Sequence, residues 1–147
     1  RILRLYNVFG QNESSKKNMA SIPYNFIQDA KLKGKIEIWQ NTVESFPPTS
    51  RDFIYVEDIC RITELLSEGI QCENTILDVG STISRSFYSI AQEIQKRLRT
   101  EIIFSEFPKN IKFSEYQFYT KSTHNLESLF YPYFVYSDFQ QKLMAII

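Results

Sequence analysis

Glycine is scarce in this sequence, with four residues in 147. Neither a G-x-G-x-x-G nor a G-x-x-x-x-G-K pattern occurs, and these are the loops that hold nucleotide phosphates at the start of a helix. A G-x-S-x-G nucleophile elbow is also missing. The sequence therefore carries no self-contained nucleotide-phosphate loop and no hydrolase signature of this kind.

Metal ligands and an excess of one charge are equally lacking. His124 is the single histidine, and the two cysteines, Cys60 and Cys72, do not have C-x-x-C spacing. We therefore expect no metal site and reduced, structural thiols, with Cys60 on the apolar side of a helix. Lys plus Arg and Asp plus Glu both number 17, so the formal net charge is zero. Such a balance gives no electrostatic reason to expect nucleic acid or an anionic membrane as a partner.

Long hydrophobic runs are absent as well. No apolar run approaches the roughly 20 residues that span a bilayer, and the N-terminus lacks the basic-then-apolar pattern of a signal peptide. We therefore expect a cytoplasmic protein. The first residue is Arg1 rather than Met, and residues 1–9 already have the pattern of a strand. This start leads us to expect a piece of a longer protein.

What the sequence does contain is an alternation of strand and helix patterns. Strands are predicted at 2–9, 35–40, 52–56, 75–79 and 101–104. Helices are predicted at 19–33, 58–68 and 87–98, with a weak final helix near 137–146. Gly34 is a suitable residue after the end of the first helix, and Ser86 is a suitable N-cap for the third. The alternation favours an α/β or α+β class.

Three polar clusters interrupt the apolar pattern. Asn7 ends the first strand, at the edge where open α/β sheets place their ligand crevice. Lys16 lies in a polar loop and is followed by Asn18 and Asn25. Arg51 opens an apolar segment, where its guanidinium could hold a phosphate through two parallel hydrogen bonds.

Each cluster also has a plainer explanation. Asn7 could only cap a strand end, and Lys16 could be one of ten solvated lysines. Arg51 could form an ion pair with Asp52 or Glu57. Spacing alone favours these plainer explanations and leaves both alternatives open.

The order of the motifs adds a resemblance. The chain reads Asn7-Val8-Phe9-Gly10, then Lys16-x-x-Met19-Ala20-Ser21, then Arg51-Asp52-Phe53-Ile54-Tyr55-Val56, then Tyr116-Gln117-Phe118-Tyr119-Thr120. This order resembles the C-terminal half of the extended short-chain dehydrogenase/reductase enzymes that act on sugar nucleotides, in the NAD-dependent epimerase/dehydratase superfamily. Within it, the second and fourth motifs resemble those of the ADP-L-glycero-D-manno-heptose 6-epimerases. The likeness runs in order over residues 1–125.

The resemblance implies a fold and a domain organisation. The fold would be α/β, the C-terminal part of an NAD(P)-binding Rossmann-type enzyme together with its small substrate-binding domain. Residues 1–10 would hold the last Rossmann strand region, and residues 11–147 the substrate domain and returning sheet elements. The family's N-terminal half carries the Gly-rich loop, the catalytic Ser and a Tyr-x-x-x-Lys pair, and none of these is in this chain. We therefore expect the chain alone to be inactive.

The resemblance also implies a reaction, a cofactor and site residues. The whole enzyme would epimerise an ADP-heptose-type nucleotide sugar by removing and returning a hydride, for lipopolysaccharide core synthesis, as a homo-oligomer. Val8 and Lys16 would contact NADP, and Lys16 would be one of two catalytic acid/base residues. Arg51 would bind the diphosphate, and the stretch from Trp39 would border the adenine. The full substrate-binding set would be Asn7, Asn18, Asn25, Trp39, Gln40, Asn41, Thr42, Arg51 and Tyr116.

Several positions depart from the family pattern. Residues 78–82, Asp-Val-Gly-Ser-Thr, replace the usual Asn-x-Gly-Thr-Gly, and Thr123 stands where an Asp is usual. Asn18 and Asn25 occupy positions where Ser and His are usual. These departures leave two alternatives open, namely a non-catalytic remnant that binds a sugar nucleotide or another subunit, and an enzyme for a different nucleotide sugar.

Overall fold

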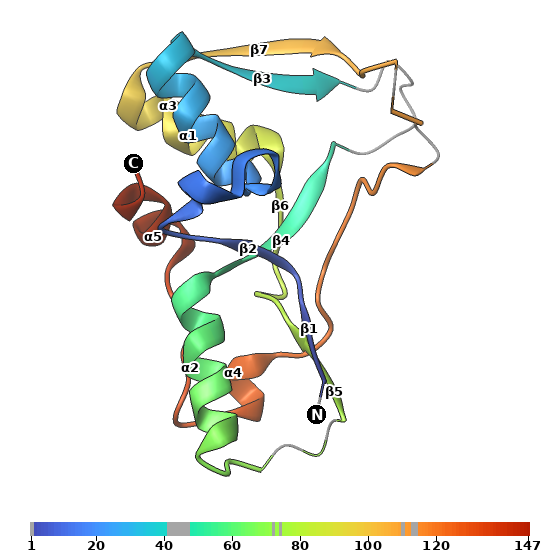
Figure 1. The fold of residues 1–147 in the computed structure, drawn as a ribbon, viewed down its shortest axis with the longest axis vertical. Coiled ribbons are helices and arrows are strands. Elements are labelled where there is room, and N and C mark those ends of the chain that lie inside the picture. Colours follow the sequence, from blue (N-terminus) through green and yellow to red (C-terminus); the bar gives the residue numbers. More distant parts are fainter. Residues whose placement is uncertain (1, 41–47, 72, 74, 110, 113–114) are drawn as a thin grey trace.

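The computed structural model is an elongated molecule with two packed parts, one above the other in Figure 1. It describes residues 2–40, 48–71, 73, 75–109, 111–112 and 115–147. Among these residues no helix is long and apolar enough to cross a membrane.

Short, mostly parallel strand pairs form the centre of both parts. In the lower part, β1 (Ile2–Leu5) pairs in parallel with β5 (Ile76–Val79). In the middle, β4 (Ser50–Tyr55) lies between β2 (Asn7–Phe9), which is parallel to it, and β6 (Ser84–Ser86), which is antiparallel. At the top, β3 (Lys35–Gln40) pairs in parallel with β7 (Glu101–Glu106).

The predicted continuous strand 2–9 is wrong in one respect, because it is divided at Tyr6. The Tyr6 backbone N–H still donates to Val79 O (3.0 Å), but the strand then leaves β5 and continues along β4. One segment thus joins the two parts, since β1 belongs to the lower sheet and β2 to the middle one (Figure 1).

The helices follow the apolar periodicity of the sequence. They are α1 (Ile22–Lys33), α2 (Val56–Ser67), α3 (Phe87–Leu98), α4 (Leu126–Leu129) and α5 (Phe139–Ala145). The predicted caps are confirmed, because the Ser86 hydroxyl accepts from Ser89 N and Gly34 ends α1 at φ 66°. The first helix begins later than predicted, after the N-cap Ser21, and a 3₁₀ segment, η1 (Glu13–Met19), precedes it. Neither β6 nor α4 was predicted, because three or four residues are too short for a periodicity.

Two hydrophobic cores meet at β4, because alternate strand residues point to opposite faces. Phe53 and Tyr55 belong to the upper core and Ile54 to the lower core. The upper core is formed by Phe9, Phe26, Ile27, Ala30, Ile36, Ile38, Phe53, Tyr55, Ile90, Ala91, Ile94, Phe139 and Leu143. The lower core is formed by Ile54, Ile62, Leu65, Leu77, Val79, Leu126, Phe130 and Phe134.

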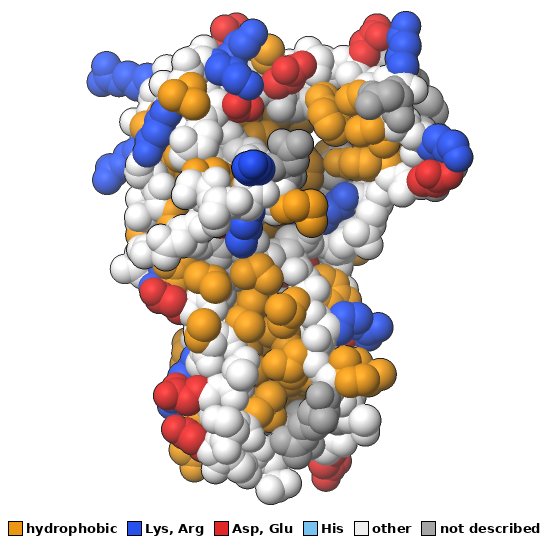
Figure 2. All heavy atoms as spheres, in the orientation of Figure 1, with side chains coloured by type: hydrophobic (Ala, Val, Ile, Leu, Met, Phe, Trp, Pro, Cys, Tyr) orange, Lys and Arg blue, Asp and Glu red, His pale blue; other side chains and the backbone are white. Residues whose placement is uncertain are grey.

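One apolar face of the lower part stays exposed. Figure 2 shows hydrophobic side chains gathered over β1 and β5, where Ile2, Leu5 and Ile76 are all exposed. Among the described strands, β1 pairs with β5 alone, so its other edge is free. Exposed edges with apolar side chains are open to further pairing. A correction concerns Cys60 in α2, which is exposed rather than on the apolar side of its helix.

Candidate functional site

A cleft lined by aromatic side chains lies between α1, β3 and the start of α3. Its volume is about 400 Å³, and we call it the aromatic cleft. It brings together three of the predicted substrate residues, Asn25, Trp39 and Tyr116, which come from segments far apart in the sequence. Its lining is Lys17, Ile22, Asn25, Phe26, Asp29, Glu37, Ile38, Trp39, Thr49, Phe87, Phe107 and Tyr116.

The aromatic wall of the cleft is built by edge-to-face contacts. Phe107 packs against Trp39 with ring centroids 5.9 Å apart and against Tyr116 with centroids 5.0 Å apart. These contacts fix the orientation of Trp39, while 42% of its surface remains exposed. An exposed indole held in this way can stack on a planar ring. The same wall is visible in Figure 2 as hydrophobic side chains over the ends of β3 and β7.

Arg51 lies behind two aromatic rings of the cleft. Its guanidinium carbon is 5.8 Å from the centroid of Phe87 and 5.6 Å from that of Tyr116. Burial lowers the pKa of the Arg51 guanidinium, and Tyr116 opposes this effect. Neither of the predicted ion pairs, with Asp52 or Glu57, is found among the described residues. Arg51 is thus a buried positive charge held against two π-faces, and its Nη1 also donates to Ser50 O (3.1 Å).

Asp52 is a buried hub beneath the cleft, and its role was not predicted. Its carboxylate accepts from Ser81 N and Oγ (both 2.7 Å), from Thr82 N (3.1 Å), and from Ser122 N and Oγ (2.8 and 2.6 Å). The side chain is fully buried. A Cβ at Gly80 would approach Asp52 Oδ2 to 2.7 Å, so only glycine fits beside it. Asp52 therefore joins β4 to two loops, one that contains Ser81 and Thr82 and one that contains Ser122.

Asn7 lies outside the aromatic cleft. Its Nδ2 donates to Asp52 O (3.1 Å) and to Thr120 Oγ1 (3.0 Å). It lines a separate cavity of about 290 Å³ with Arg4, Leu5, Tyr6, Gln117 and Thr120. The structure thus supports the plainer explanation for Asn7, whose amide nitrogen bonds to neighbouring segments, although the residue also lines this cavity.

Lys16 is held by a buried carboxylate that the sequence did not reveal. Glu13 is 1% exposed, and it accepts from Gly10 N (3.0 Å), Ser21 N (2.6 Å) and Ser21 Oγ (2.8 Å). The Lys16 ammonium lies 3.6 Å from Glu13 Oε2. Glu13 therefore ties the end of β2 to the start of α1 and keeps Lys16 beside it. No periodicity marks such a residue, because its partners lie three and eight positions away in a loop.

The remaining predicted residues have mixed outcomes. Asn25 lines the cleft, but its Nδ2 donates to Ala20 O (3.1 Å). Val8 is half-buried and packs against the lower core. The side chains of Asn18 and Gln40 and the whole of Asn41 and Thr42 lie outside the described residues.

Two departures from the family pattern contact each other. Asp78, where the family has Asn, accepts from Thr123 Oγ1 (2.8 Å), where the family has Asp. Asp78 also accepts from Arg4 Nε (2.6 Å). Burial acts to raise the pKa of Asp78, but Arg4, Thr123 and His124 lower it on balance. The two departing positions are thus joined by a hydrogen bond in this structure.

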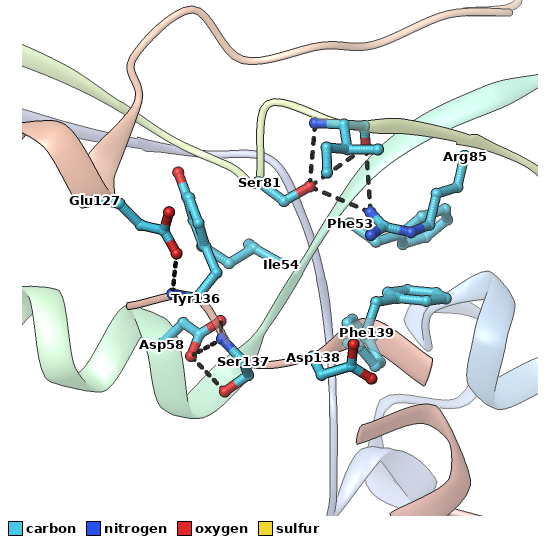
Figure 3. A pocket seen from close by; sticks show the side chains of 12 residues that line it. Phe53, Ile54, Asp58, Ser81, Arg85, Glu127, Tyr136, Ser137, Asp138 and Phe139 are labelled. Atoms are coloured by element: carbon cyan, nitrogen blue, oxygen red, sulfur yellow. Dashed lines mark hydrogen bonds between the residues drawn. The ribbon is translucent and has the colours of Figure 1, made fainter. Parts of the chain in front are cut away.

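A second cavity, of about 340 Å³, lies at the junction of the two parts (Figure 3). We call it the junction cavity, and it is lined by Phe9, Phe53, Ile54, Asp58, Ser81, Ile83, Arg85, Glu127, Tyr136, Ser137, Asp138 and Phe139. Asp58 accepts from Ser137 N and Oγ, and Glu127 accepts from Tyr136 N (2.8 Å). Burial raises the pKa of Asp58 and that of Tyr136, the latter to about 12. The polar groups of this cavity therefore fasten the C-terminal segment.

Comparisons of sequence agree with these observations. The model of the NAD dependent epimerase/dehydratase family matches residues 1–80. The ADP-L-glycero-D-manno-heptose-6-epimerase of Pseudomonas aeruginosa is 32% identical over 99 residues, which cover 66% of this chain and 29% of that protein. The protein of the same name from Brachyspira hyodysenteriae is 27% identical over 121 residues, which cover 82% of this chain and 36% of that protein. The chain thus spans about a third of the length of these curated relatives.

A comparison of structures confirms the predicted fold class. The crystal structure of the Helicobacter pylori ADP-L-glycero-D-manno-heptose-6-epimerase matches with a TM-score of 0.75 and 20% identity. The match covers 97% of this chain and 40% of that one. The fold is therefore α/β, part of a Rossmann-type extended short-chain dehydrogenase/reductase.

Proposed function

Because the chain belongs to the NAD-dependent epimerase/dehydratase family, we propose that it supplies the substrate-binding part of an ADP-heptose 6-epimerase. The aromatic cleft is the observation that carries this proposal, because it places Trp39 and Tyr116 on one wall with the Arg51 guanidinium behind it. An exposed indole suits a base, and an arginine fork suits a diphosphate. The relatives named above as ADP-heptose epimerases favour adenine as the base and a heptose as the sugar.

The division of labour within the whole enzyme follows from what this chain contains. Residues 1–10 would complete the Rossmann sheet, and residues 11–147 would supply the substrate domain and the returning strands. The Tyr-x-x-x-Lys pair is not in the sequence, so we propose that the chain alone does not epimerise its substrate. The acting enzyme would be a cytoplasmic homo-oligomer in lipopolysaccharide core synthesis.

In this proposal the chain has two roles, which are to bind the substrate and to transfer a proton. Inverting a carbon without an acidic C–H requires removing a hydride and returning it to the opposite face, and the nicotinamide supplies that transfer when bound. Lys16 would exchange a proton with the reacting hydroxyl through its Nζ, opposite a second acid/base residue from outside this chain. Arg51 would hold the diphosphate while the sugar turns between two orientations.

The residues near β2 fit the nicotinamide group. Val8 offers a half-buried apolar side chain, and Lys16 offers an ammonium that is partly exposed beside Glu13. An apolar surface and a cation together suit a planar ring with a polar amide. We propose NADP rather than NAD as the cofactor, and residues outside this chain would discriminate between the two.

A non-catalytic remnant is the second candidate, and one observation favours it. Thr82 stands where the family pattern has glycine, and its φ is 60°, which a β-branched residue rarely adopts. Against a remnant, the two departing positions Asp78 and Thr123 form a hydrogen bond with each other.

Nucleotide binding by the full chain tests the proposal. Trp39 is the single tryptophan, so its fluorescence reports directly on the cleft. We expect ADP to bind more tightly than UDP. We also expect Arg51→Ala to weaken the binding of ADP by roughly tenfold or more. Arg61→Ala is the matched control, because Arg61 is an exposed helical residue paired with Glu64. Tighter binding of UDP would indicate another nucleotide sugar, and no nucleotide binding would favour a subunit-interaction role.

A further inference from the structure

Lys17, the residue that follows Lys16, lines the aromatic cleft. The two neighbours differ in their partners. Lys16 lies beside the buried Glu13 carboxylate, whereas Lys17 forms no ion pair with any residue that the structure describes. The Lys17 side chain is exposed. The charge of the Lys16 ammonium is therefore balanced by Glu13, whereas the Lys17 ammonium is available to a ligand in the cleft.

The backbone at Lys17 is unusual. Its φ is 50° and its ψ is −123°, a conformation that glycine adopts easily and a lysine adopts only at a cost in free energy. Its carbonyl accepts from Ala20 N (3.1 Å), and Glu13 holds the loop at both ends. The loop thus imposes a glycine-like conformation on a charged residue, and strain of this kind is concentrated at functional sites.

The charges of the cleft are arranged along α1. Two carboxylates line it, Asp29 in the C-terminal half of that helix and Glu37 in β3, and both interact with the Lys33 ammonium, which lies 2.8 Å from Asp29 Oδ1. Lys17 lies at the other end, before the N-cap Ser21, about two helical turns from Asp29. An anionic ligand group would therefore lie at the Lys17 end of the cleft.

We propose that Lys17 is a substrate-binding residue of the aromatic cleft and contacts the diphosphate of the nucleotide ligand. This inference rests on the proposed function, which places a nucleoside diphosphate in the cleft. A diphosphate carries more negative charge than Arg51 alone can balance, and Arg51 lies behind the aromatic wall, so a cation that lines the cleft itself is chemically suited to it. Neither the strand and helix patterns nor the family motifs singled out Lys17.

Lys17→Gly provides an unusual test, because it should change stability and affinity in opposite directions. Glycine relieves the strain at φ 50°, so we expect the melting temperature to rise by about 2–4 °C. Loss of the ammonium should weaken the binding of ADP by roughly tenfold, measured by Trp39 fluorescence. Adenosine, which lacks phosphates, should bind both proteins alike. Lys17→Arg keeps the charge and should retain ADP affinity within about threefold.

Asn12→Gly is the matched control. Asn12 has φ 62° in the same loop but does not line the cleft, so its replacement should leave ADP affinity unchanged. Unchanged ADP affinity in Lys17→Gly, or an equal loss for adenosine and ADP, would overturn the inference and leave the proposed function intact. Failure of the wild-type chain to bind ADP would instead contradict the proposed function, and the inference with it.

Discussion

The aromatic cleft and the junction cavity are similar in volume but differ in how their polar groups are used. In the junction cavity, Asp58, Glu127 and Asp138 each accept a backbone N–H from the C-terminal segment. In the aromatic cleft, Trp39 is exposed and Lys17 has no ion-pair partner among the described residues. Polar groups that are already satisfied hold a fold together, and groups left available bind ligands. Size alone would not have distinguished the two.

Asp52 is fully buried and accepts five hydrogen bonds, so its removal should have the largest effect. Asp52→Ala removes the acceptor of five hydrogen bonds from Ser81, Thr82 and Ser122, and of these donors Thr82 N and Ser81 Oγ keep a second acceptor. We expect the free energy of unfolding to fall by about 3–5 kcal/mol in urea titrations. Asp52→Asn keeps one acceptor oxygen and should lose less. Equal stability of Asp52→Ala and wild type would show that the two regions are not coupled through this hub.

Trp39→Ala should affect ligand binding at the cleft more than the stability of the fold. Because 42% of the Trp39 surface is exposed and the rest packs against neighbours such as Phe107, the free energy of unfolding should fall by about 1–2 kcal/mol, less than for a fully buried aromatic residue. The affinity for ADP should fall roughly tenfold, because the stacking surface is lost. Calorimetric titration is the suitable measurement, since this variant has no tryptophan. Tyr88→Ala, another exposed aromatic residue and one that does not line the cleft, is the control and should bind ADP normally.

Thr82→Gly should act on stability alone. The substitution removes a β-branched side chain from φ 60°, so the free energy of unfolding should rise by about 1 kcal/mol. Thermal unfolding measures this change. Thr82 lines neither the aromatic cleft nor the junction cavity, so ADP affinity should stay the same. A loss of stability would show that the hydroxyl, rather than the strain, dominates at this position.

Asp58→Asn should have the smallest effect, and it concerns pH. Burial raises the pKa of Asp58 in the folded state above its ordinary value of 3.8. The folded state therefore holds this proton more tightly than the unfolded state, so the Asp58 contribution to stability declines as pH rises above about 4. Asp58→Asn should remove that decline, measured as melting temperature against pH between 4 and 7. An unchanged pH profile would contradict the assignment, and nucleotide affinity serves as the unaffected control.

Local patterns predicted much of the fold. The apolar spacing of α3 and the Ser86 N-cap act within a few residues of each other, and so does the glycine that ends α1. The family resemblance predicted Trp39, Asn25 and Tyr116 as substrate-binding residues, and all three line the aromatic cleft. The separation of Asn7 from that site was not predicted, because it depends on Thr120, more than 100 positions away.

The amino-acid order was sufficient for the class of the fold, most helix and strand positions and the family, because periodicity, caps and motifs are written in neighbouring residues. It did not reveal the buried Glu13 carboxylate that joins β2 to α1, or the hydrogen-bonded Asp52 hub. It also did not show which of the adjacent residues Lys16 and Lys17 lines the aromatic cleft. Asp52 reaches partners 29 to 70 positions away, and such contacts exist only after the strands have assembled. Which lysine lines the cleft depends on one backbone conformation, at φ 50°, that the closed loop imposes on Lys17 and that no local preference would select.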